Sequence, residues 1–145
     1  MKPKPPAGPF TIISVDDDPS VYSFLLFAQQ KVFPQAQVHA FQTTHQLTEH
    51  MLSGSRPKSH LLLLDLHLPT RTDGLRLLKQ FRNDPRLRLV PIVVLSASDE
   101  KADVEAVYDL GGSAFMQKPQ TIDEWVHMVS VLKAYWYDTV TLLNK

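Results

Sequence analysis

Short apolar runs alternate with longer amphipathic stretches along most of the chain. Five of the runs have the length of a strand and lie at residues 10–15, 36–41, 60–64, 91–95 and 113–117. The run at 60–64 is almost entirely leucine without alternation, which is typical of a strand buried on both faces of a sheet. Stretches with helical spacing of apolar residues separate the runs. The pattern therefore predicts an α/β fold in which parallel strands alternate with helices.

Capping residues predict where the helices begin and end. Asp18 followed by Pro19 is typical of a helix N-cap with proline at the first helical position. The third helix is predicted over residues 74–84, with Leu75, Leu78 and Phe81 on one side. Further N-caps are predicted at Thr43 or Thr44, at Asp99 and at Thr121, and helix ends at Gly54 and at Gly111.

The composition indicates one ordinary globular domain. The chain has 145 residues, of which 43% are hydrophobic, and its 15 basic and 15 acidic residues cancel. A neutral chain without a basic run lacks the electrostatic footprint of a nucleic-acid-binding protein. The absence of cysteine excludes disulfide scaffolds, thiolate metal sites and cysteine nucleophiles. There is neither a secretion signal nor an apolar run of about 18 residues, so we expect a soluble, cytoplasmic protein without membrane contact.

The two ends of the chain differ in composition from the middle. Four of the eleven prolines fall within residues 1–9, which we expect to form a flexible arm. Residues 10–136 are predicted to form the domain and residues 137–145 a C-terminal tail. The aromatic side chains around Trp136 either extend the core or form an interface with another protein.

Ionisable or hydroxyl side chains follow four of the five predicted strands. They are Asp16 and Asp17, Asp65, Ser96, and Lys118. Ligands of open α/β sheets bind outside the carboxyl ends of the strands, and parallel strands bring all of these groups to the same edge. Each group alone also fits an ordinary turn residue. Their recurrence after successive strands favours a functional site.

Charge repulsion indicates what this site binds. If the first and third strands are adjacent, Asp17 and Asp65 repel each other, by about 4 kcal/mol at 4 Å and an effective dielectric constant of 20. A proton, a lysine or a divalent cation must offset that repulsion. Because carboxylate oxygens suit Mg²⁺, which keeps open positions for phosphate oxygens, we expect a site for a metal ion together with a phosphoryl group.

Four motifs carry a resemblance to a known family. The chain resembles the receiver domain of two-component response regulators from about residue 10 to residue 132. The motifs are VDDDP at 15–19, LLLLDLHLP at 61–69, VVLSAS at 93–98 and FMQKPQ at 115–120. The resemblance implies a doubly wound, flavodoxin-like sheet of five parallel strands in the order 2-1-3-4-5.

The resemblance also implies roles for the acidic residues. Asp65 would be the phosphoacceptor, and Mg²⁺ would be the cofactor. Asp17 would bind Mg²⁺ directly and Asp16 through water. The backbone carbonyl of His67 would complete the ligands from the protein.

Further roles follow from the resemblance for the residues that contact the phosphoryl group. Ser96 and the backbone N–H of Ala97 would bind it, and Lys118 would pair first with the acceptor carboxylate and then with the phosphoryl oxygens. The Lys118–Pro119 peptide is typically cis in the family. Phe115 stands where many members carry an aromatic switch residue that turns inward together with Ser96.

The expected partner is a sensor histidine kinase or a phosphotransfer protein. The resemblance implies a signalling domain rather than an enzyme, whose output surface is the face of the fourth helix, fifth strand and fifth helix. That face or the C-terminal tail would hold a homodimer. The tail is similar to that of small receivers paired with phytochrome-type kinases, and too few residues follow the fifth helix for an output domain. We therefore expect a stand-alone receiver.

Two other functions compete with this interpretation. A phosphorylation-independent interaction module is suggested by Phe115, which lacks a hydroxyl, and by a loop from Asp65 to Gly74 that is one residue longer than usual in the family. An Mg²⁺-dependent phosphohydrolase with an aspartyl nucleophile is disfavoured, because His67 replaces the second acid of its D-x-D signature and the chain has no room for a cap domain.

The histidines show no ligand-like spacing. The His67 side chain is either an exposed loop histidine or a group that influences water access to the acceptor. His45 and His50 are expected on a solvated helix face.

Overall fold

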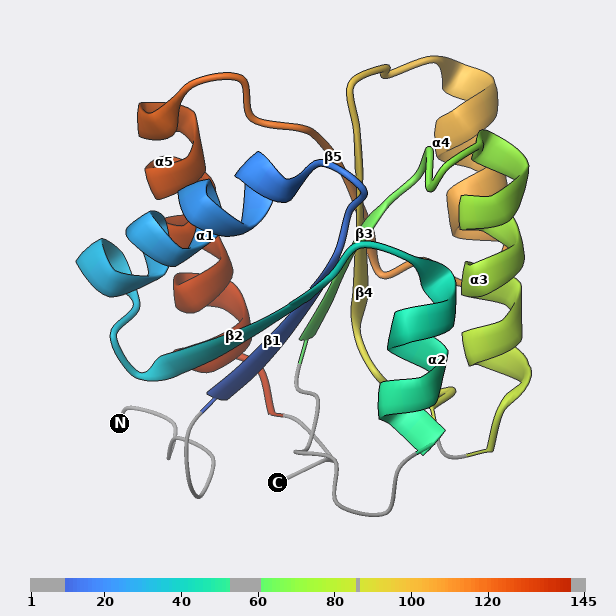
Figure 1. Cartoon of the computed structure of the whole chain (residues 1–145), viewed down its shortest axis with the longest axis horizontal. Helices are drawn as coiled ribbons and strands as arrows, with labels where there is room; N and C mark the ends of the chain where they lie inside the picture. Colours follow the sequence, from blue (N-terminus) through green and yellow to red (C-terminus); the bar gives the residue numbers. More distant parts are fainter. Residues whose placement is uncertain (1–9, 53–60, 86, 142–145) are drawn as a thin grey trace.

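Five parallel strands form the central sheet, in the order β2-β1-β3-β4-β5 (Figure 1). The structure is a computed structural model that describes residues 10–52, 61–85 and 87–141. The strands are β1 (Phe10–Val15), β2 (Ala36–Phe41), β3 (Leu61–Asp65), β4 (Ile92–Ser96) and β5 (Ala114–Gln117). The helices are α1 (Pro19–Val32), α2 (Thr44–Leu52), α3 (Arg71–Asn83), α4 (Lys101–Asp109) and α5 (Ile122–Leu132), followed by the π-helical η1 (Lys133–Tyr137). The predicted fold class and strand order are confirmed.

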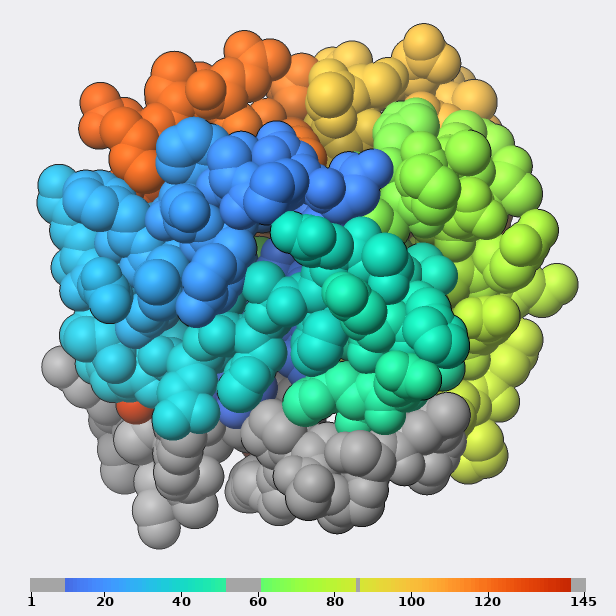
Figure 2. Space-filling model, in the orientation of Figure 1, coloured from blue at the N-terminus to red at the C-terminus, as the bar shows by residue number. Residues whose placement is uncertain are grey.

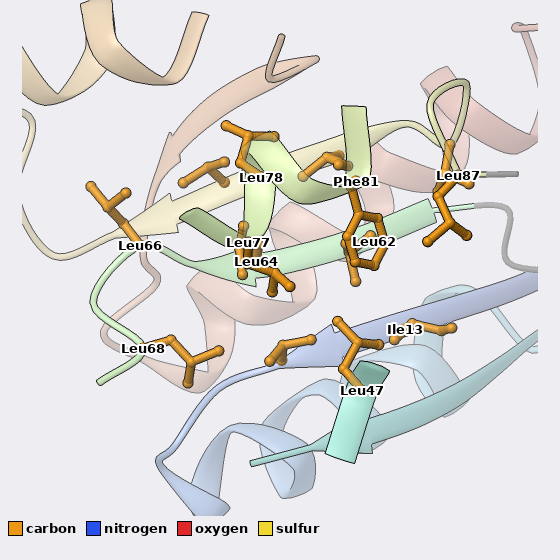
Figure 3. Close-up of a cluster of buried hydrophobic side chains, with 14 of the residues drawn as sticks. Ile13, Leu47, Leu62, Leu64, Leu66, Leu68, Leu77, Leu78, Phe81 and Leu87 are labelled. Carbon is orange, nitrogen blue, oxygen red and sulfur yellow. The ribbon is translucent and has the colours of Figure 1, made fainter. Parts of the chain in front are cut away.

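Helices cover both faces of the sheet. Figure 1 shows α1 and α5 on one face and α2, α3 and α4 on the other. Between the sheet and the second group of helices, β-strand residues such as Leu62 and Leu64 pack against Leu77, Leu78 and Phe81 of α3 (Figure 3). A separate cluster between the sheet and the first group includes buried residues of α1 and α5. Because both faces are covered, β1, β3 and β4 are buried along their whole length.

Local capping chemistry explains where most helices begin. The Asp18 side chain accepts a hydrogen bond from the Ser20 N–H at 2.9 Å, and Thr121 accepts one from the Glu124 N–H at 3.1 Å. Thr43 accepts a hydrogen bond from the Gln46 N–H at 3.1 Å, so it supplies the cap of α2. The predicted cap at Asp99 is wrong, because Glu100 holds that position and makes no side-chain capping bond. The predicted helix end at Gly54 lies outside the described residues.

The start of α3 also differs from the prediction. α3 begins at Arg71, three residues before the predicted start at Gly74, because Thr70 caps it by accepting the Asp73 N–H at 3.2 Å. Gly74 is consequently inside the helix, where a Cβ atom would lie 1.9 Å from the Leu66 carbonyl oxygen. A glycine therefore allows the first turn of α3 to approach the chain that follows β3.

Smaller differences affect the strand ends. β1 and β2 have the predicted bounds, whereas β3 and β4 each reach one residue further than predicted, to Asp65 and Ser96. The predicted first residue of the third strand, His60, lies outside the described residues. Boundary shifts of one residue leave every strand-end side chain at the same edge of the sheet.

One histidine prediction is wrong and one is confirmed. The His45 side chain is exposed and lies 3.2 Å from Glu49. The His50 ring instead stacks on His39 of β2, with centroids 6.1 Å apart, and lies 4.9 Å from the Phe41 ring. The helix pattern alone does not reveal this contact, because it depends on how α2 packs over the edge of the sheet.

The aromatic side chains of η1 divide between core and surface. Trp136 and Tyr137 pack against the cluster beneath α1 and α5, and the Tyr137 ring lies 5.8 Å from that of Phe10 and 5.2 Å from that of Phe33. Tyr135 is 55% exposed. The expectation that these aromatic side chains extend the core is therefore confirmed for Trp136 and Tyr137 but not for Tyr135. Within the described ranges, no helix combines the length and apolar character needed to cross a membrane.

Candidate functional site

Three carboxylates meet at the carboxyl ends of β1 and β3. Asp65 ends β3, while Asp16 and Asp17 follow β1, and these two strands are neighbours in the sheet. Each carboxylate offers an oxygen within 4.8 Å of the others. Asp16 and Asp65 are only 6% and 8% exposed, whereas Asp17 is exposed. The structure thus brings together the three acids that the sequence places at the strand ends.

Lys118 lies between the two buried acids. Its Nζ atom is 2.6 Å from Asp16 Oδ2 and 3.9 Å from Asp65 Oδ2. The Lys118 N–H donates to the carbonyl of Ser96 at 2.7 Å, which extends the pairing of β4 and β5 beyond the strand ends. Lys118 thus lies within ion-pair distance of the Asp65 carboxylate, and its shorter contact, with Asp16, could not be predicted from the sequence.

Burial and charge oppose each other in this cluster. Burial is the main reason why the pKa of Asp65 rises to about 6, and the charge of Asp16 adds to it, while Lys118 acts in the opposite direction. Burial lowers the pKa of Lys118, but its hydrogen bond and ion pair with Asp16 outweigh that effect, so the net shift is upward. Asp65 therefore binds a proton more readily than an ordinary aspartate, while Lys118 stays charged.

Backbone N–H groups of the following turns orient the two buried carboxylates. The Asp18 N–H donates to Asp16 Oδ1 at 3.0 Å, and the His67 N–H donates to Asp65 Oδ1 at 3.2 Å. Each bond closes a turn of the Asx type directly after a strand. The second oxygen of each carboxylate stays directed toward Lys118. The His67 side chain is exposed.

The end of β4 contributes a hydroxyl beside the acids. Ser96 is fully buried, and its Oγ atom accepts the Ser98 N–H at 3.1 Å. Leu95 pairs with Asp65 in the β3–β4 register, which places Ser96 one residue beyond the acid along the edge. Ala97 follows and is exposed. All of the strand-end side chains named from the sequence therefore lie along one edge.

Phe115 lies on β5, away from this edge. It is partly buried and packs against the cluster beneath α2, α3 and α4. Its backbone N–H donates to the hydroxyl of Tyr108 on α4 at 3.1 Å. Tyr108 could not be predicted from the sequence, because nothing marks a helical tyrosine as the acceptor of a backbone N–H from a strand seven residues later.

An ion pair that the sequence analysis also missed joins the start of α3 to α4. Arg71 Nε donates to Asp103 Oδ1, and Asp103 is 5% exposed. Arg71 belongs to the segment that is one residue longer than usual. A separation of 32 residues left no local signal for this contact.

The peptide before Pro119 does not have the expected geometry. Within the described part of the chain, the cis peptide is Leu68–Pro69, so the family expectation for Lys118–Pro119 is not met. Both are X–Pro bonds, for which the preference for trans is small.

The donor set fits a hard divalent cation. Three carboxylates at one edge offer oxygen ligands and excess negative charge, which Mg²⁺ and similar ions prefer. Lys118 alone cannot neutralise all three acids. A phosphoryl group bound beside Asp65 would lie within reach of both a cation and Lys118.

Comparisons with known proteins agree on one family. A family model described as the response regulator receiver domain matches residues 12–130. Response regulator Rcp1 of Synechocystis is 36% identical over 86 residues, which are 59% of this chain and 58% of Rcp1. The chain therefore matches less than two thirds of the length of that relative.

Solved structures give the same likeness over nearly the whole chain. The Mn²⁺-bound form of Rcp1 has a TM-score of 0.80 and 26% identity, covering 92% of this chain and 99% of the other. The phosphorylated cyanobacterial phytochrome response regulator RcpA has a TM-score of 0.82 and 26% identity, covering 94% and 99%. The predicted resemblance to small phytochrome-type receivers is confirmed.

Proposed function

Because the chain belongs to the response regulator receiver domain family, we propose that it accepts a phosphoryl group on Asp65 and signals through the resulting change of shape. The observation that carries the proposal is the convergence of Asp16, Asp17, Asp65 and Lys118. RcpA, which is similar to this chain along most of its length, is a phosphorylated protein. Receiver domains are signalling domains, so no turnover of a small substrate is proposed.

The proposed reaction transfers a phosphoryl group to a carboxylate. An oxygen of Asp65 attacks the phosphorus of a phosphohistidine on the donor protein. The bond from phosphorus to the imidazole nitrogen breaks, and its electron pair stays on that nitrogen. Lys118 moves its positive charge from Asp16 toward the new phosphoryl oxygens. The Ser96 hydroxyl and the Ala97 N–H donate hydrogen bonds to the same oxygens.

A metal ion is part of this proposal. Asp16, Asp17, Asp65 and the carbonyl of His67 would hold Mg²⁺, which when bound neutralises charge on the phosphoryl oxygens. The three carboxylates, which offer oxygens within 4.8 Å of one another, support this proposal, as does the Mn²⁺-bound form of the similar Rcp1. The Asp16 carboxylate would share its charge between the ion and Lys118, which would leave more of the Lys118 charge for the phosphoryl group.

The proposed output is a movement of α4 and β5. When Ser96 shifts toward the phosphoryl group, the loop before α4 follows, and Phe115 fills the space behind it. The donor is a sensor histidine kinase or a phosphotransfer protein in the cytoplasm, and the α4–β5–α5 face or the C-terminal segment receives the next partner, including a second copy. We propose residues 10–136 as the unit that carries these functions.

Acetyl phosphate with Mg²⁺ tests the proposal directly. We expect intact-protein mass spectrometry to find one added phosphoryl group on the wild type and on Asp18→Asn, and none on Asp65→Asn or after chelation of Mg²⁺. Asp18→Asn is the matched control, since it changes a nearby exposed aspartate that caps α1. An unmodified wild type would instead favour a phosphorylation-independent interaction module.

A further inference from the structure

The outer edge of β2 presents backbone groups that face away from the sheet. The Phe10 N–H donates to the Gln35 carbonyl at 3.3 Å and the Asp16 N–H to the Phe41 carbonyl at 3.0 Å. In a parallel ladder, every second residue of a strand points its N–H and C=O toward the same neighbour. The odd-numbered residues of β2 therefore face β1, and Val38 and Ala40 face outward.

Side chains close this edge at both ends but not in the middle. The Gln29 Nε2 atom donates to the Ala36 carbonyl at 2.9 Å, and the Gln42 N–H donates to Gln46 Oε1 at 3.0 Å. Among the described residues, none forms a hydrogen bond to the outward-facing backbone groups of Val38 or Ala40. The open part of the edge is thus a short stretch framed by two glutamine side chains.

The opposite edge of the sheet is protected, which makes β2 the exception. β5 has only four residues, and its Phe115 N–H bonds to Tyr108. β2 has six residues, AQVHAF, without the proline, glycine or Asp, Glu, Lys or Arg that commonly block strand pairing. An unprotected edge of this kind is a template for another strand.

A groove of about 640 Å³ runs along this edge. Pro19, Val21 and Tyr22 of α1 form one wall, and Gln46 and His50 of α2 form the other. Residues 38–41 of β2 lie between the walls. Figure 2 shows this face of the molecule, with the blue α1 and the blue-green α2 on either side of β2.

We propose that the groove binds an extended peptide segment of a partner protein, which adds a sixth strand to the sheet beside β2. Main-chain hydrogen bonds to Val38 and Ala40 would hold it. Alternate peptide side chains point to opposite faces, so apolar ones would meet Val21 and Tyr22, and polar ones would meet Gln46. Asp18 lies at one end of the groove and favours a basic peptide residue there.

The walls favour a single strand over a second copy of this chain. A second copy would bring its own α1 and α2 against the helices that line the groove. A lone peptide needs only the width of one strand, about 4.8 Å from β2. The site requires no phosphoryl group, so the proposal goes beyond the signalling role of Asp65.

A display library of random twelve-residue peptides tests the proposal when peptides are selected for binding to the full chain. The decisive variant is Ala40→Pro, which removes an outward N–H while sparing the bonds to β1, and Ala40→Val is its control of similar size. We expect selected peptides to bind wild type and Ala40→Val equally and Ala40→Pro at least tenfold more weakly. Equal binding to Ala40→Pro, or recovery of no binding peptide, would overturn the proposal.

Amide hydrogen exchange in the wild type gives a test that needs no variant. A selected peptide should slow exchange of the Val38 and Ala40 amides at least tenfold, while the His39 amide, which faces β1, is slow throughout. Unchanged exchange at Val38 and Ala40 would refute the proposal. A dimer by sedimentation that protects these amides without peptide would assign the groove to a second copy.

Phosphorylation by acetyl phosphate separates this proposal from the previous one. Ala40→Pro should be labelled on Asp65 like the wild type, because Ala40 belongs to the groove alone. A wild type that binds peptide but takes no phosphoryl group would overturn only the proposed phosphorylation.

Discussion

Asp65 carries its charge where burial and the neighbouring Asp16 both oppose it. Its pKa of about 6 in the folded chain exceeds the value of about 4 expected in the unfolded chain. The folded state therefore binds the proton more tightly, and the unfavourable contribution of the charged form appears as pH rises from about 4 through about 6. At neutral pH the charged Asp65 therefore lowers the stability of the fold, and a bound cation would offset this cost.

We expect Asp65→Asn to stabilise the fold at pH 7.5. Removing the buried charge should raise the free energy of unfolding by about 2 kcal/mol, and the gain should largely disappear at pH 4, where Asp65 is mostly protonated in the folded state. Urea denaturation at both pH values measures the difference. Asp18→Asn should give no gain at either pH, because hydrogen bonds from Ser20 lower the pKa of that exposed residue. A pH-independent gain for Asp65→Asn would contradict the assigned cause.

The same pKa predicts how phosphorylation depends on pH. Only the carboxylate form of Asp65 is a nucleophile, so at low Mg²⁺ concentration the initial rate with acetyl phosphate should fall about tenfold per pH unit well below pH 6. Saturating Mg²⁺ favours the charged carboxylate and should move the midpoint to lower pH. Phosphorylation rates measured by intact-protein mass spectrometry at several Mg²⁺ concentrations test this prediction. A pH midpoint that does not change with Mg²⁺ concentration would argue that Asp65 is not a ligand of the ion.

At the scale of elements, α3 packs against the loop that follows Asp65. Thr70 caps the helix, and Gly74 permits the approach to Leu66, the residue directly after Asp65. Arg71 of the same turn pairs with the buried Asp103 of α4. The loop after Asp65, α3 and α4 therefore share contacts within a few residues of the site.

Gly74→Ala should disturb this junction. A methyl group 1.9 Å from the Leu66 carbonyl oxygen cannot be accommodated without moving backbone, so the free energy of unfolding should fall by about 1–3 kcal/mol or more. Thermal unfolding checks the loss, and NMR shifts at Leu66 and His67 check where it arises. Lys79→Ala, an exposed change on the same helix, should stay within about 0.5 kcal/mol of the wild type. Equal stability for both variants would remove the steric argument.

Local sequence signals predicted most of the strands and helices. The apolar runs predicted the strands to within a residue, most clearly for β3 and β4, which are buried on both faces and apolar up to their last residue. Asp18 and Thr121 cap helices through bonds to residues two or three positions away. Asp99 failed as a cap because adjacent residues compete for that position and the sequence does not rank them. Contacts such as Arg71–Asp103 and His39–His50 depend on how elements pack, which periodicity does not encode.

Ligands of open α/β sheets bind at the carboxyl ends of the strands, which explains why the site residues could be predicted from the sequence. Parallel strands bring distant positions together at one edge, so the sequence alone predicts that Asp65 and Lys118 share a site. The rule does not determine which acid Lys118 contacts, because that depends on side-chain distances. It also does not reveal Tyr108, whose hydroxyl bonds to β5.

At the scale of the whole molecule, Arg82 joins segments far from the site. From α3 it donates to the carbonyls of Val90 at 2.6 Å, Gly111 at 2.8 Å and Arg88 at 3.1 Å. Burial lowers the pKa of Arg82. The guanidinium fork therefore links α3 to the turns that enter β4 and β5, at the end of the sheet opposite the acids.

Arg82→Lys tests this link. A lysine cannot reproduce the planar fork, so two or more carbonyls lose their donor and the free energy of unfolding should fall by about 2 kcal/mol. Arg76→Lys, on the exposed side of the same helix, is the matched control and should change stability by less than about 0.5 kcal/mol. Chemical denaturation compares the two, and similar small effects would show that the linkage contributes little.

The contact between Tyr137 and Phe10 has a practical consequence for anyone who attaches another protein to this one. Phe10 begins β1 and Tyr137 ends η1, so the first strand and the last helix are held together at the end of the sheet remote from the acidic edge. A fluorophore or an affinity tag attached close to Phe10 or Tyr137 by a short linker therefore starts at the end of the sheet opposite Asp65. Such reporters can follow the protein's chemistry without obstructing it.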